Sequence, residues 1–403
     1  MSALDVFLGD LRVGLLEQLG DEIDTHRFSP DPAWLAMRDR PILGQIVEDW
    51  LPDPKACDGG MIPWFDHLLP LEDRPLRRAI ARDAGVDVGD ALALLAWLGD
   101  DLIGAVRLRV ADGAQLRHRR AIRRVETAPD SATYRTSLPG AQWKLSLQER
   151  GGALSLPVSG AQGEWIGKFH AESNAAAVRH EYATMTWARA SGVSVPEIRW
   201  VHAENIHGLP DDVPRGNGDV FLIRRFDRGG AGRRIHAEDF AQILDLPQGA
   251  KQFSSDYEAI AAVLAALCPR EDVRAFVRQL VFVLLSGNDD AHAKNWSLVY
   301  PDGVRARLSP AYDLCPTALI QQATPKLALR LNGDNRRSFT AVTSASFERL
   351  AAVTGVSAQE MGAWVRDDAT RVRDAWATTD ARALFLDGER RLLERHMEHV
   401  LRA

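Results

Sequence analysis

Apolar and polar residues follow a mixed pattern in the N-terminal part of the chain, with short strand-like and helix-like segments side by side. The extended segments 5–8 and 11–15 flank Gly9-Asp10, a pair typical of a hairpin turn. Segments 74–84 and 90–97 carry apolar residues at helical spacings. This region is therefore predicted to mix strands and helices.

The middle of the chain has mostly strand-like periodicity. Residues 134–226 are predicted to be β-rich, with a hairpin at Gly151-Gly152 between strands 144–148 and 153–157, and with one helix over 175–191. A glycine follows the predicted helix in the sequence, as is common after the C-terminal end of a helix.

The pattern changes to long amphipathic helices after a glycine-rich turn at 229–232. Helices are predicted over 257–267, 272–285 and 382–401. The C-terminal half is therefore expected to be mostly helical. Together with the turn-forming residues near 128, the pattern predicts an α+β fold in three parts, 1–128, 129–235 and 236–403.

Composition supports a compact protein of more than one unit. The chain has 403 residues, of which 46% are hydrophobic and 26% charged, the balance of a soluble globular protein. No apolar run approaches the roughly 20 residues needed to span a bilayer, and no leader-like start is present, so we expect a cytoplasmic location without membrane contact. The three cysteines lack the paired spacing of a zinc site or a disulfide framework.

Charge argues against non-specific nucleic-acid binding by the whole surface. The net charge is −6, whereas such binding depends on a broad positive field. A basic cluster at 117–124 is the local exception. Its role stays open between a solvated face and contact with a partner or DNA.

The most informative segment is 286–296, where Asp290 and Asn295 have the DxxxxN spacing of a kinase catalytic loop. In such a loop the carboxylate meets the substrate hydroxyl, and the amide oxygen holds a metal ion that bridges nucleotide phosphates. Asp290 is therefore the predicted base and Asn295 a predicted Mg²⁺ ligand. Asp313, 18 residues after Asn295, fits the second metal ligand, although Phe-Gly does not follow it as in most kinases.

Upstream residues fit the phosphate-binding parts of a kinase in the right order. The turn 137–144 offers backbone amides of Gly140, Ala141 and Gln142, with Lys144 on the strand that follows. This motif is weak, and a surface turn with a lysine would be the better explanation if no other kinase part were present. Lys168 on a strand and Glu181 on the next helix match the lysine–glutamate pair, against the alternative of an ordinary surface pair.

Three further residues are weaker candidates. Phe226 ends a predicted strand over 220–226, where adenine would meet the backbone between two lobes, although an aromatic residue there is more often part of a core. Lys294, inside the loop, is a candidate nucleotide contact. His292 is interpreted as structural support for the loop, because no partner ligands have metal-site spacing.

These motifs resemble those of HipA-family kinases. The resemblance lies in GAQxK at 140–144, the IxKF strand around Lys168, HEYATMTWARASGVSVP at 180–196, RRFDR at 224–228, GNDDAHAKNWSL at 287–298 and LSPAYDL at 308–314. The segments 63–70 and 98–105 are similar to the family's N-terminal subdomain, so that the match covers nearly the whole chain. One departure is Arg224, where well-known members have a glutamate in the hinge strand.

The resemblance implies a bilobal, protein-kinase-like fold with an extra N-terminal mixed α/β subdomain and a helical C-lobe. It implies ATP and Mg²⁺ as cofactors, Asp290 as base, Asn295 and Asp313 as metal ligands, and Lys144 and Lys168 as phosphate contacts. It further implies that Ser137 is autophosphorylated, since a phosphate there would compete with ATP for the same amides and lysines.

The resemblance also implies a biological role as the toxin of a toxin–antitoxin pair linked to persistence. Family members pair with a helix-turn-helix antitoxin of the HipB type, which contacts operator DNA, and their known substrates include aminoacyl-tRNA synthetases. Blocked translation is the implied source of toxicity. Two alternatives remain at this point: a small-molecule kinase of the aminoglycoside or choline type, and a catalytically silent corepressor that holds an antitoxin on DNA.

Overall fold

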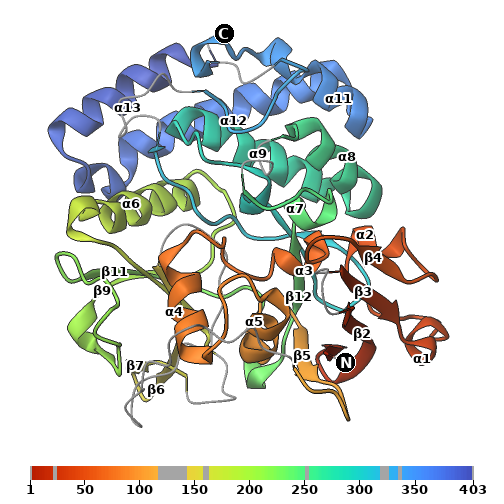
Figure 1. The fold of residues 1–403 in the computed structure, drawn as a ribbon. Helices are drawn as coiled ribbons and strands as arrows, with labels where there is room; N and C mark the ends of the chain where they lie inside the picture. Colours follow the sequence, from red (N-terminus) through yellow and green to blue (C-terminus); the bar gives the residue numbers. More distant parts are fainter. Residues whose placement is uncertain are drawn as a thin grey trace. The chain divides into compact units, whose positions relative to one another are not determined.

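The computed structural model describes residues 2–20, 25–116, 143–157, 163–249, 254–317, 326–334 and 338–401 (Figure 1). These residues form two compact units. The first takes its described residues from 1–175, 201–249 and 299–304, and the second takes them from 176–200, 250–298 and 305–403. Both helices and strands are abundant, which confirms the predicted α+β class.

An antiparallel sheet of five strands begins the first unit. Its order is β4-β3-β2-β1-β5, so that the hairpin predicted around Gly9-Asp10 lies between its central strands. Gly9 has a φ of 60°, which a tight turn requires and glycine adopts without strain. The strands are β1 (Ala3–Leu8), β2 (Leu11–Leu19), β3 (Thr25–Pro30), β4 (Lys55–Cys57) and β5 (Val106–Val110).

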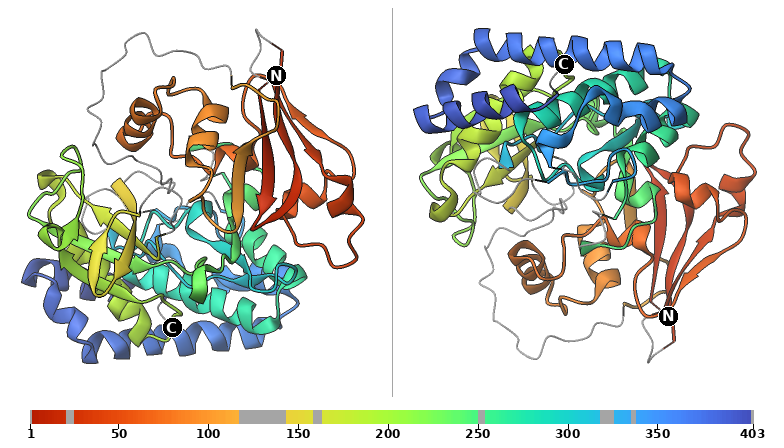
Figure 2. Two further views of the ribbon diagram at one scale, coloured as in Figure 1. Left: turned by 90° about the horizontal axis from the view of Figure 1, so that it is seen from below. Right: turned by 90° about the horizontal axis from the view of Figure 1, so that it is seen from above.

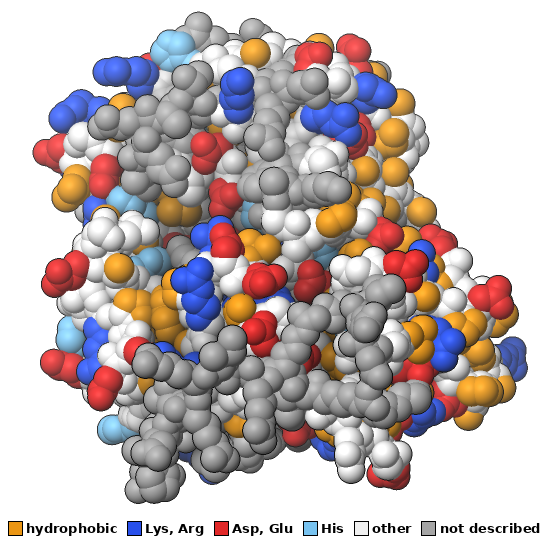
Figure 3. Space-filling model, viewed as in Figure 1, with side chains coloured by type: hydrophobic (Ala, Val, Ile, Leu, Met, Phe, Trp, Pro, Cys, Tyr) orange, Lys and Arg blue, Asp and Glu red, His pale blue; other side chains and the backbone are white. Residues whose placement is uncertain are grey.

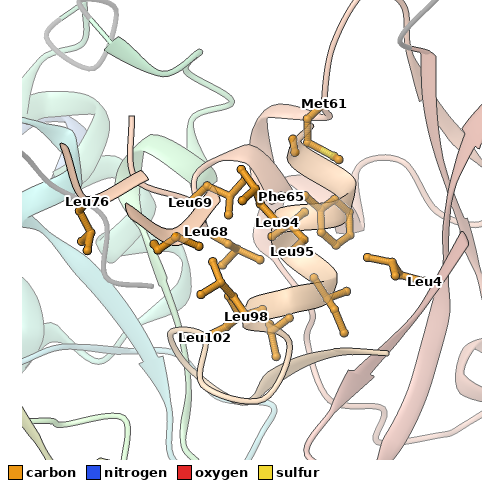
Figure 4. Close-up of a cluster of buried hydrophobic side chains, with 14 of the residues drawn as sticks. Leu4, Met61, Phe65, Leu68, Leu69, Leu76, Leu94, Leu95, Leu98 and Leu102 are labelled. Atoms are coloured by element: carbon orange, nitrogen blue, oxygen red, sulfur yellow. The ribbon is translucent and has the colours of Figure 1, made fainter. Parts of the chain in front are cut away.

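Short helices belong to the same unit, and most of them share one apolar core with this sheet. They are α1 (Pro32–Leu35), α2 (Gln45–Glu48), α3 (Pro63–Asp66), α4 (Pro75–Ala84), α5 (Ala91–Leu98) and α7 (Phe240–Ile243). Figure 4 shows Leu94 and Leu95 of α5 beside Phe65 of α3, with Leu98 near Leu102 and with Leu4 of β1 on the other side of Phe65. The helices predicted over 74–84 and 90–97 are thus confirmed as α4 and α5, and their apolar faces form a core.

The second sheet of this unit has six strands in the order β10-β7-β6-β8-β11-β9. Its strands are β6 (Trp143–Arg150), β7 (Ala153–Ser155), β8 (Trp165–Phe169), β9 (Ile198–His202), β10 (Ile206–His207) and β11 (Asp219–Arg224); β12 (His236–Asp239) lies later in the chain. Gly151 and Gly152 both have positive φ, and they form the predicted hairpin between β6 and β7.

One apolar cluster joins the two sheets within the first unit. Leu4 and Val6 of β1 belong to the same cluster as Leu145 of β6 and Trp165 of β8. The N-terminal region and the β-rich region are therefore parts of one compact unit. The predicted boundaries at 128 and 235 stay a prediction.

Buried charges add a second connection inside this unit. Arg225 donates to Asp101 Oδ1 at 2.8 Å and to Asp227 Oδ2 at 2.8 Å, and Arg228 reaches the same two carboxylates at 2.9 and 2.8 Å. All four side chains are at most 5% exposed. Burial alone would raise the pKa of Asp227, but the charges of Arg225 and Arg228 together outweigh it and hold this pKa well below its usual value. We call these four residues the buried ion network.

The second unit is mainly helical, and its helices lie side by side in all three ribbon views (Figures 1 and 2). It contains α6 (Ala177–Ala190), α8 (Tyr257–Leu267), α9 (Arg270–Ser286), α11 (Glu348–Thr354), α12 (Ala358–Thr378) and α13 (Asp387–His399), with the short strand β14 (Arg307–Leu308). Strand β13 (Ser297–Tyr300) crosses the boundary between the units. The helices predicted over 175–191, 257–267 and 272–285 are confirmed.

The helix predicted over 382–401 is confirmed over 387–399, but it begins later than predicted. The chain forms a 3₁₀-helix, η8 (Asp380–Leu384), and then passes through extended residues Phe385 and Leu386 before α13 begins. The Glu389 side chain accepts a hydrogen bond from the Leu386 N–H at 2.7 Å and so caps the start of α13. This cap, together with the packing of the Phe385 ring on Trp376, ends the helical run that periodicity alone suggested.

On the face shown in Figure 3, Lys and Arg side chains are interspersed with Asp and Glu among the residues that are drawn in colour. Within the described ranges, none of the helices has the length and apolar character that crossing a membrane requires.

Candidate active site

The candidate catalytic loop starts where α9 ends. Gly287 follows the helix in the left-handed conformation, with a φ of 69°, and the Asn288 N–H bonds back to the Val283 carbonyl at 3.1 Å. This glycine-dependent ending turns the chain sharply out of the helix. The loop is therefore set on the rigid end of a buried helix.

Asn288 connects the loop to the segment that contains Asp313. Its Oδ1 accepts from the Asp290 N–H at 3.0 Å, and its Nδ2 donates to the Asp313 carbonyl at 3.3 Å. Thr317 Oγ1 lies 3.4 Å from the same Asn288 oxygen and accepts from the Asp289 N–H at 3.0 Å. Asn288 is 1% exposed, so that these bonds are shielded from water.

Asp290 and Asn295 are brought together as the DxxxxN spacing predicts. Asn295 Nδ2 donates to the Asp290 carbonyl at 2.7 Å, and the His292 N–H donates to the same oxygen at 2.8 Å. Since an amide group carries its donors and its acceptor on different atoms, this bond directs the Asn295 nitrogen into the loop and leaves its oxygen as a ligand atom. The Asp290 side chain is 59% exposed, whereas Asn295 is buried.

Aromatic side chains hold the rest of the loop. Tyr257 Oη and Trp296 Nε1 each donate to the Ala291 carbonyl at 3.3 Å, and Tyr312 Oη donates to the Lys294 carbonyl at 2.8 Å. His292 Nε2 lies 3.9 Å from Asp290 Oδ1, and its supporting role stays a prediction. The backbone of Lys294 is thus fixed, and its candidate nucleotide contact stays a prediction.

Asp313 has an uncommon backbone conformation. Its φ is 54°, in the left-handed region that aspartate tolerates better than most residues, and its carbonyl accepts the bond from Asn288 described above. Such outliers cluster at active sites and ligand clamps. Asp290, Asn295 and Asp313 all belong to the second unit.

The two predicted phosphate-binding lysines lie in the first unit, directly opposite each other. Lys144 of β6 pairs with Lys168 of β8, and Lys168 pairs on its other side with Phe221 of β11. Residues that are directly opposite share a face of the sheet, so both ammonium groups belong to one face. Lys168 Nζ lies 5.5 Å from the Phe221 ring centre. Lys144 is 9% exposed and Lys168 is 3% exposed.

His170 adds a titratable group next to this pair that the motifs did not indicate. It is 7% exposed, and its Nε2 has no hydrogen-bond partner among the described residues. Burial, with the charges of Lys168 and Lys144, lowers the pKa of His170 to about 4. The side chain is therefore neutral near pH 7 and adds no charge of its own beside the two lysines.

The other predicted residues are placed as follows. Glu181 is buried on α6 in the second unit, so its pairing with Lys168 of the first unit stays a prediction. Phe226 is half-buried between two members of the buried ion network, Arg225 and Asp227, and its adenine contact stays a prediction as well. Ser137, Gly140, Ala141, Gln142 and the basic cluster at 117–124 lie outside the described residues.

Two family models match the chain. The HipA N-terminal domain matches residues 4–109, and the HipA-like C-terminal domain matches residues 136–376, which is more than half of the sequence. The chain belongs to the HipA family. The predicted resemblance is therefore confirmed.

Relatives of this HipA-family chain agree with a kinase. Y4dM of Sinorhizobium fredii, whose name describes it as a kinase, is 36% identical over 93% of this chain and 91% of its own. The serine/threonine-protein kinase toxin HipA of Shewanella oneidensis is 27% identical over 82% of this chain and 79% of its own. These relatives support a kinase that uses ATP.

The fold agrees with that of a HipA protein of known structure. HipA of Shewanella oneidensis MR-1, solved with HipB and its operator DNA, is similar with a TM-score of 0.71 over 99% of this chain and 96% of its own, at 21% identity. The predicted HipA-like fold class is confirmed by this similarity.

Proposed function

We propose that the chain is an ATP-dependent serine/threonine protein kinase that acts as the toxin of a toxin–antitoxin pair. The observation that carries this proposal is the hydrogen bond from Asn295 to the Asp290 carbonyl, with Asn288 tying the same loop to Asp313. In this arrangement the Asp290 carboxylate is exposed, and the amide oxygen of Asn295, five residues later, is available as a metal ligand. Phosphoryl transfer from ATP requires both groups.

Asp290 is the proposed base. Its carboxylate would accept the proton of a serine or threonine hydroxyl while the hydroxyl oxygen bonds to the γ-phosphorus of ATP and the bond to the ADP oxygen breaks. The loop bonds at its carbonyl and N–H fix the backbone that bears this carboxylate. Positioning of this kind is the main contribution of a protein to phosphoryl transfer.

Asn295 and Asp313 would hold Mg²⁺, which when bound neutralises charge on the nucleotide phosphates. The donor set fits this ion, because Mg²⁺ prefers oxygen ligands and is usually held by one or two carboxylates together with phosphates and waters. Among the described residues, no group of three or more His, Cys, Asp or Glu side chains is placed to hold a metal by itself. Such a group is not needed here, because the phosphates of ATP would supply the remaining Mg²⁺ ligands.

Lys144 and Lys168 are the proposed phosphate contacts of the first unit. Two buried ammonium groups on one sheet face form an anion site, and their shielding from water strengthens their attraction for phosphate. Amides of Gly140, Ala141 and Gln142 are the further proposed contacts, with Glu181, Phe226 and Lys294 as the remaining candidates.

Antitoxin binding and a translation-related substrate complete the proposal. The similar Shewanella structure contains HipB and operator DNA, which supports a helix-turn-helix antitoxin as partner and DNA contact through that antitoxin. A substrate such as an aminoacyl-tRNA synthetase would link the kinase to inhibited translation and persistence. Cytoplasmic location follows from this role.

Inhibitory autophosphorylation at Ser137 is part of the proposal, and it gives the test. We would incubate the purified chain with Mg-ATP beside Asp290→Ala and Ser137→Ala, and then record intact and peptide masses. The wild type is expected to gain one phosphate at Ser137, which neither variant gains. A wild type that gains no phosphate would remove the proposed switch, and a gain in Asp290→Ala would remove Asp290 as base.

A further inference from the structure

The helix that bears Glu181 is held at its start by residues from the C-terminal end of the chain. Arg179 and His180 directly precede Glu181 on α6, and both contact one carboxylate, that of Glu389 on α13. Arg179 Nη1 donates to Glu389 Oε2 at 2.8 Å, and Arg179 Nη2 donates to Oε1 at 3.0 Å. His180 Nε2 lies 2.7 Å from Glu389 Oε1. This forked geometry fixes direction as well as distance.

The contact is shielded from water. Side-chain exposure is 19% for Arg179, 4% for His180 and 23% for Glu389. Burial alone would raise the pKa of Glu389, but hydrogen bonds from Arg179, Leu386 and His180 outweigh it and lower this pKa to about 2. Glu389 is therefore ionised throughout the neutral range, so its negative charge faces Arg179 across that range.

The surrounding residues extend the same attachment. The His180 ring stacks on Phe385, with ring centres 5.9 Å apart, and Arg179 Nη1 also donates to the Leu384 carbonyl at 2.7 Å. Further along α6, Trp187 Nε1 donates to the Val372 carbonyl of α12 at 3.0 Å, and its ring packs on Trp376 at 4.8 Å. Helix α6 is thus bound along its length to the helical unit.

We propose that Glu389 is a positioning residue for phosphoryl transfer, which fixes the start of α6 and thereby the place of Glu181. This inference rests on the proposed kinase function. Protein kinases depend on the helix that carries the glutamate of the lysine–glutamate pair, and many regulate activity by moving it. In this chain the C-terminal helix holds that helix in place, so the position of Glu181 is set by the fold and depends on the last 20 or so residues of the sequence.

Glu389→Gln is the test variant. Glutamine has nearly the same shape and still caps the start of α13, whereas the charge that holds Arg179 and His180 is lost. Glu394→Gln is the matched control on the same helix, because the Glu394 carboxylate accepts hydrogen bonds from Arg382 and Trp376, which lie outside α6. Both variants remove one carboxylate–arginine pair from α13.

We expect Glu389→Gln to lower kcat/KM for ATP about tenfold while Glu394→Gln stays within about twofold of the wild type. In a double-mutant cycle, Glu389→Gln should change kcat/KM by less than about twofold once Glu181→Gln is present, since the first residue acts through the second. If the fold-changes in kcat/KM of Glu389→Gln and Glu181→Gln multiply in the double variant, Glu389 acts independently of Glu181. That result would overturn the proposal.

Hydrogen exchange separates this proposal from the kinase assignment. Amides of residues 180–190 should exchange faster in Glu389→Gln than in Glu394→Gln, whether or not the chain transfers phosphate. Unchanged exchange in α6 would overturn the positioning role. A wild type without phosphoryl transfer, together with faster exchange in Glu389→Gln, would instead refute the proposed function and leave the attachment of α6 standing.

Discussion

At the residue scale, the amide side chain of Asn288 organises the candidate catalytic loop. One oxygen and one nitrogen of this group reach the backbone of Asp290 and of Asp313, and the side chain is closed off from water. The two predicted functional acids are thereby linked through a residue that need not touch substrate. Asn288 would therefore act on phosphoryl transfer indirectly, because it fixes the backbone of Asp290 and that of Asp313.

Asn288→Ala is expected to lower both stability and activity. Removing both bonds leaves the Asp290 N–H and the Asp313 carbonyl without this partner, which costs about 1–3 kcal/mol for each buried group that finds no other partner. The rate of phosphoryl transfer should fall at least about tenfold. Asn217→Ala is the control, because Asn217 makes similar bonds to Asp219 at an exposed turn, and its effect should stay within about 0.5 kcal/mol. Equal urea midpoints for the two variants would contradict the role of Asn288.

Sequence reasoning predicted Asp290, Asn295 and Asp313 as residues of this candidate site and missed Asn288. The spacing of Asp290, Asn295 and Asp313 is visible in the sequence because kinase chemistry demands those residue types. The bond from Asn288 to Asp313 joins positions 25 residues apart and follows only from the fold. A local signal did exist, since an asparagine two residues before Asp290 can accept its N–H in an Asx turn.

At the element scale, the end of α9 decides where the catalytic loop begins. Gly287 has a φ of 69° there, and Gly355 ends α11 with nearly the same φ of 68°. The two glycines meet the same backbone requirement, but only Gly287 leads into Asp290. They therefore form a natural pair of sites for comparison.

Gly287→Ala and Gly355→Ala should each cost about 1 kcal/mol of stability, because a Cβ disfavours the left-handed conformation. Only Gly287→Ala should also reduce phosphoryl transfer, since relaxation of its strain shifts the loop that follows. Thermal unfolding and a kinase assay on both variants give the comparison. Equal activity of the two proteins would show that the loop does not depend on this helix end.

Helix boundaries were predictable where apolar periodicity was continuous. Helix α8 has the predicted bounds, whereas α12 was not among the helices predicted by residue range, and its buried stripe includes the charged Asp368. Asp368 is buried through pairing with Arg274 and Arg278 of α9. A charged residue on a buried face hides a helix from pattern analysis.

At the scale of the whole molecule, the HipA N-terminal domain is a built-in part of the first unit. Asp101, from that domain, lies in the buried ion network with Arg225 and Arg228, which come from the RRFDR motif. The motif was interpreted from the sequence as a hinge strand for adenine. Its pairing with residue 101 was beyond sequence reasoning, because more than 120 residues separate the partners.

Asp101→Ala should lower the free energy of unfolding by about 3–5 kcal/mol, because it leaves buried arginine charge without a partner. The neighbouring Asp100 gives the control. It pairs with Arg107 at the surface, its side chain is 50% exposed, and Asp100→Ala should cost less than about 1 kcal/mol. Urea unfolding of both variants measures the difference. Similar losses would contradict a structural role for the buried ion network.

Transfer of labelled phosphate to protein tests the central claim most directly. We would incubate the chain, beside Asp290→Ala, with Mg-ATP labelled in its γ-phosphate and a bacterial extract, and then separate proteins from small molecules. Label on serine or threonine of proteins, present with the wild type and absent with Asp290→Ala, is the predicted result. Label confined to small molecules, or no difference between wild type and Asp290→Ala, would contradict the account.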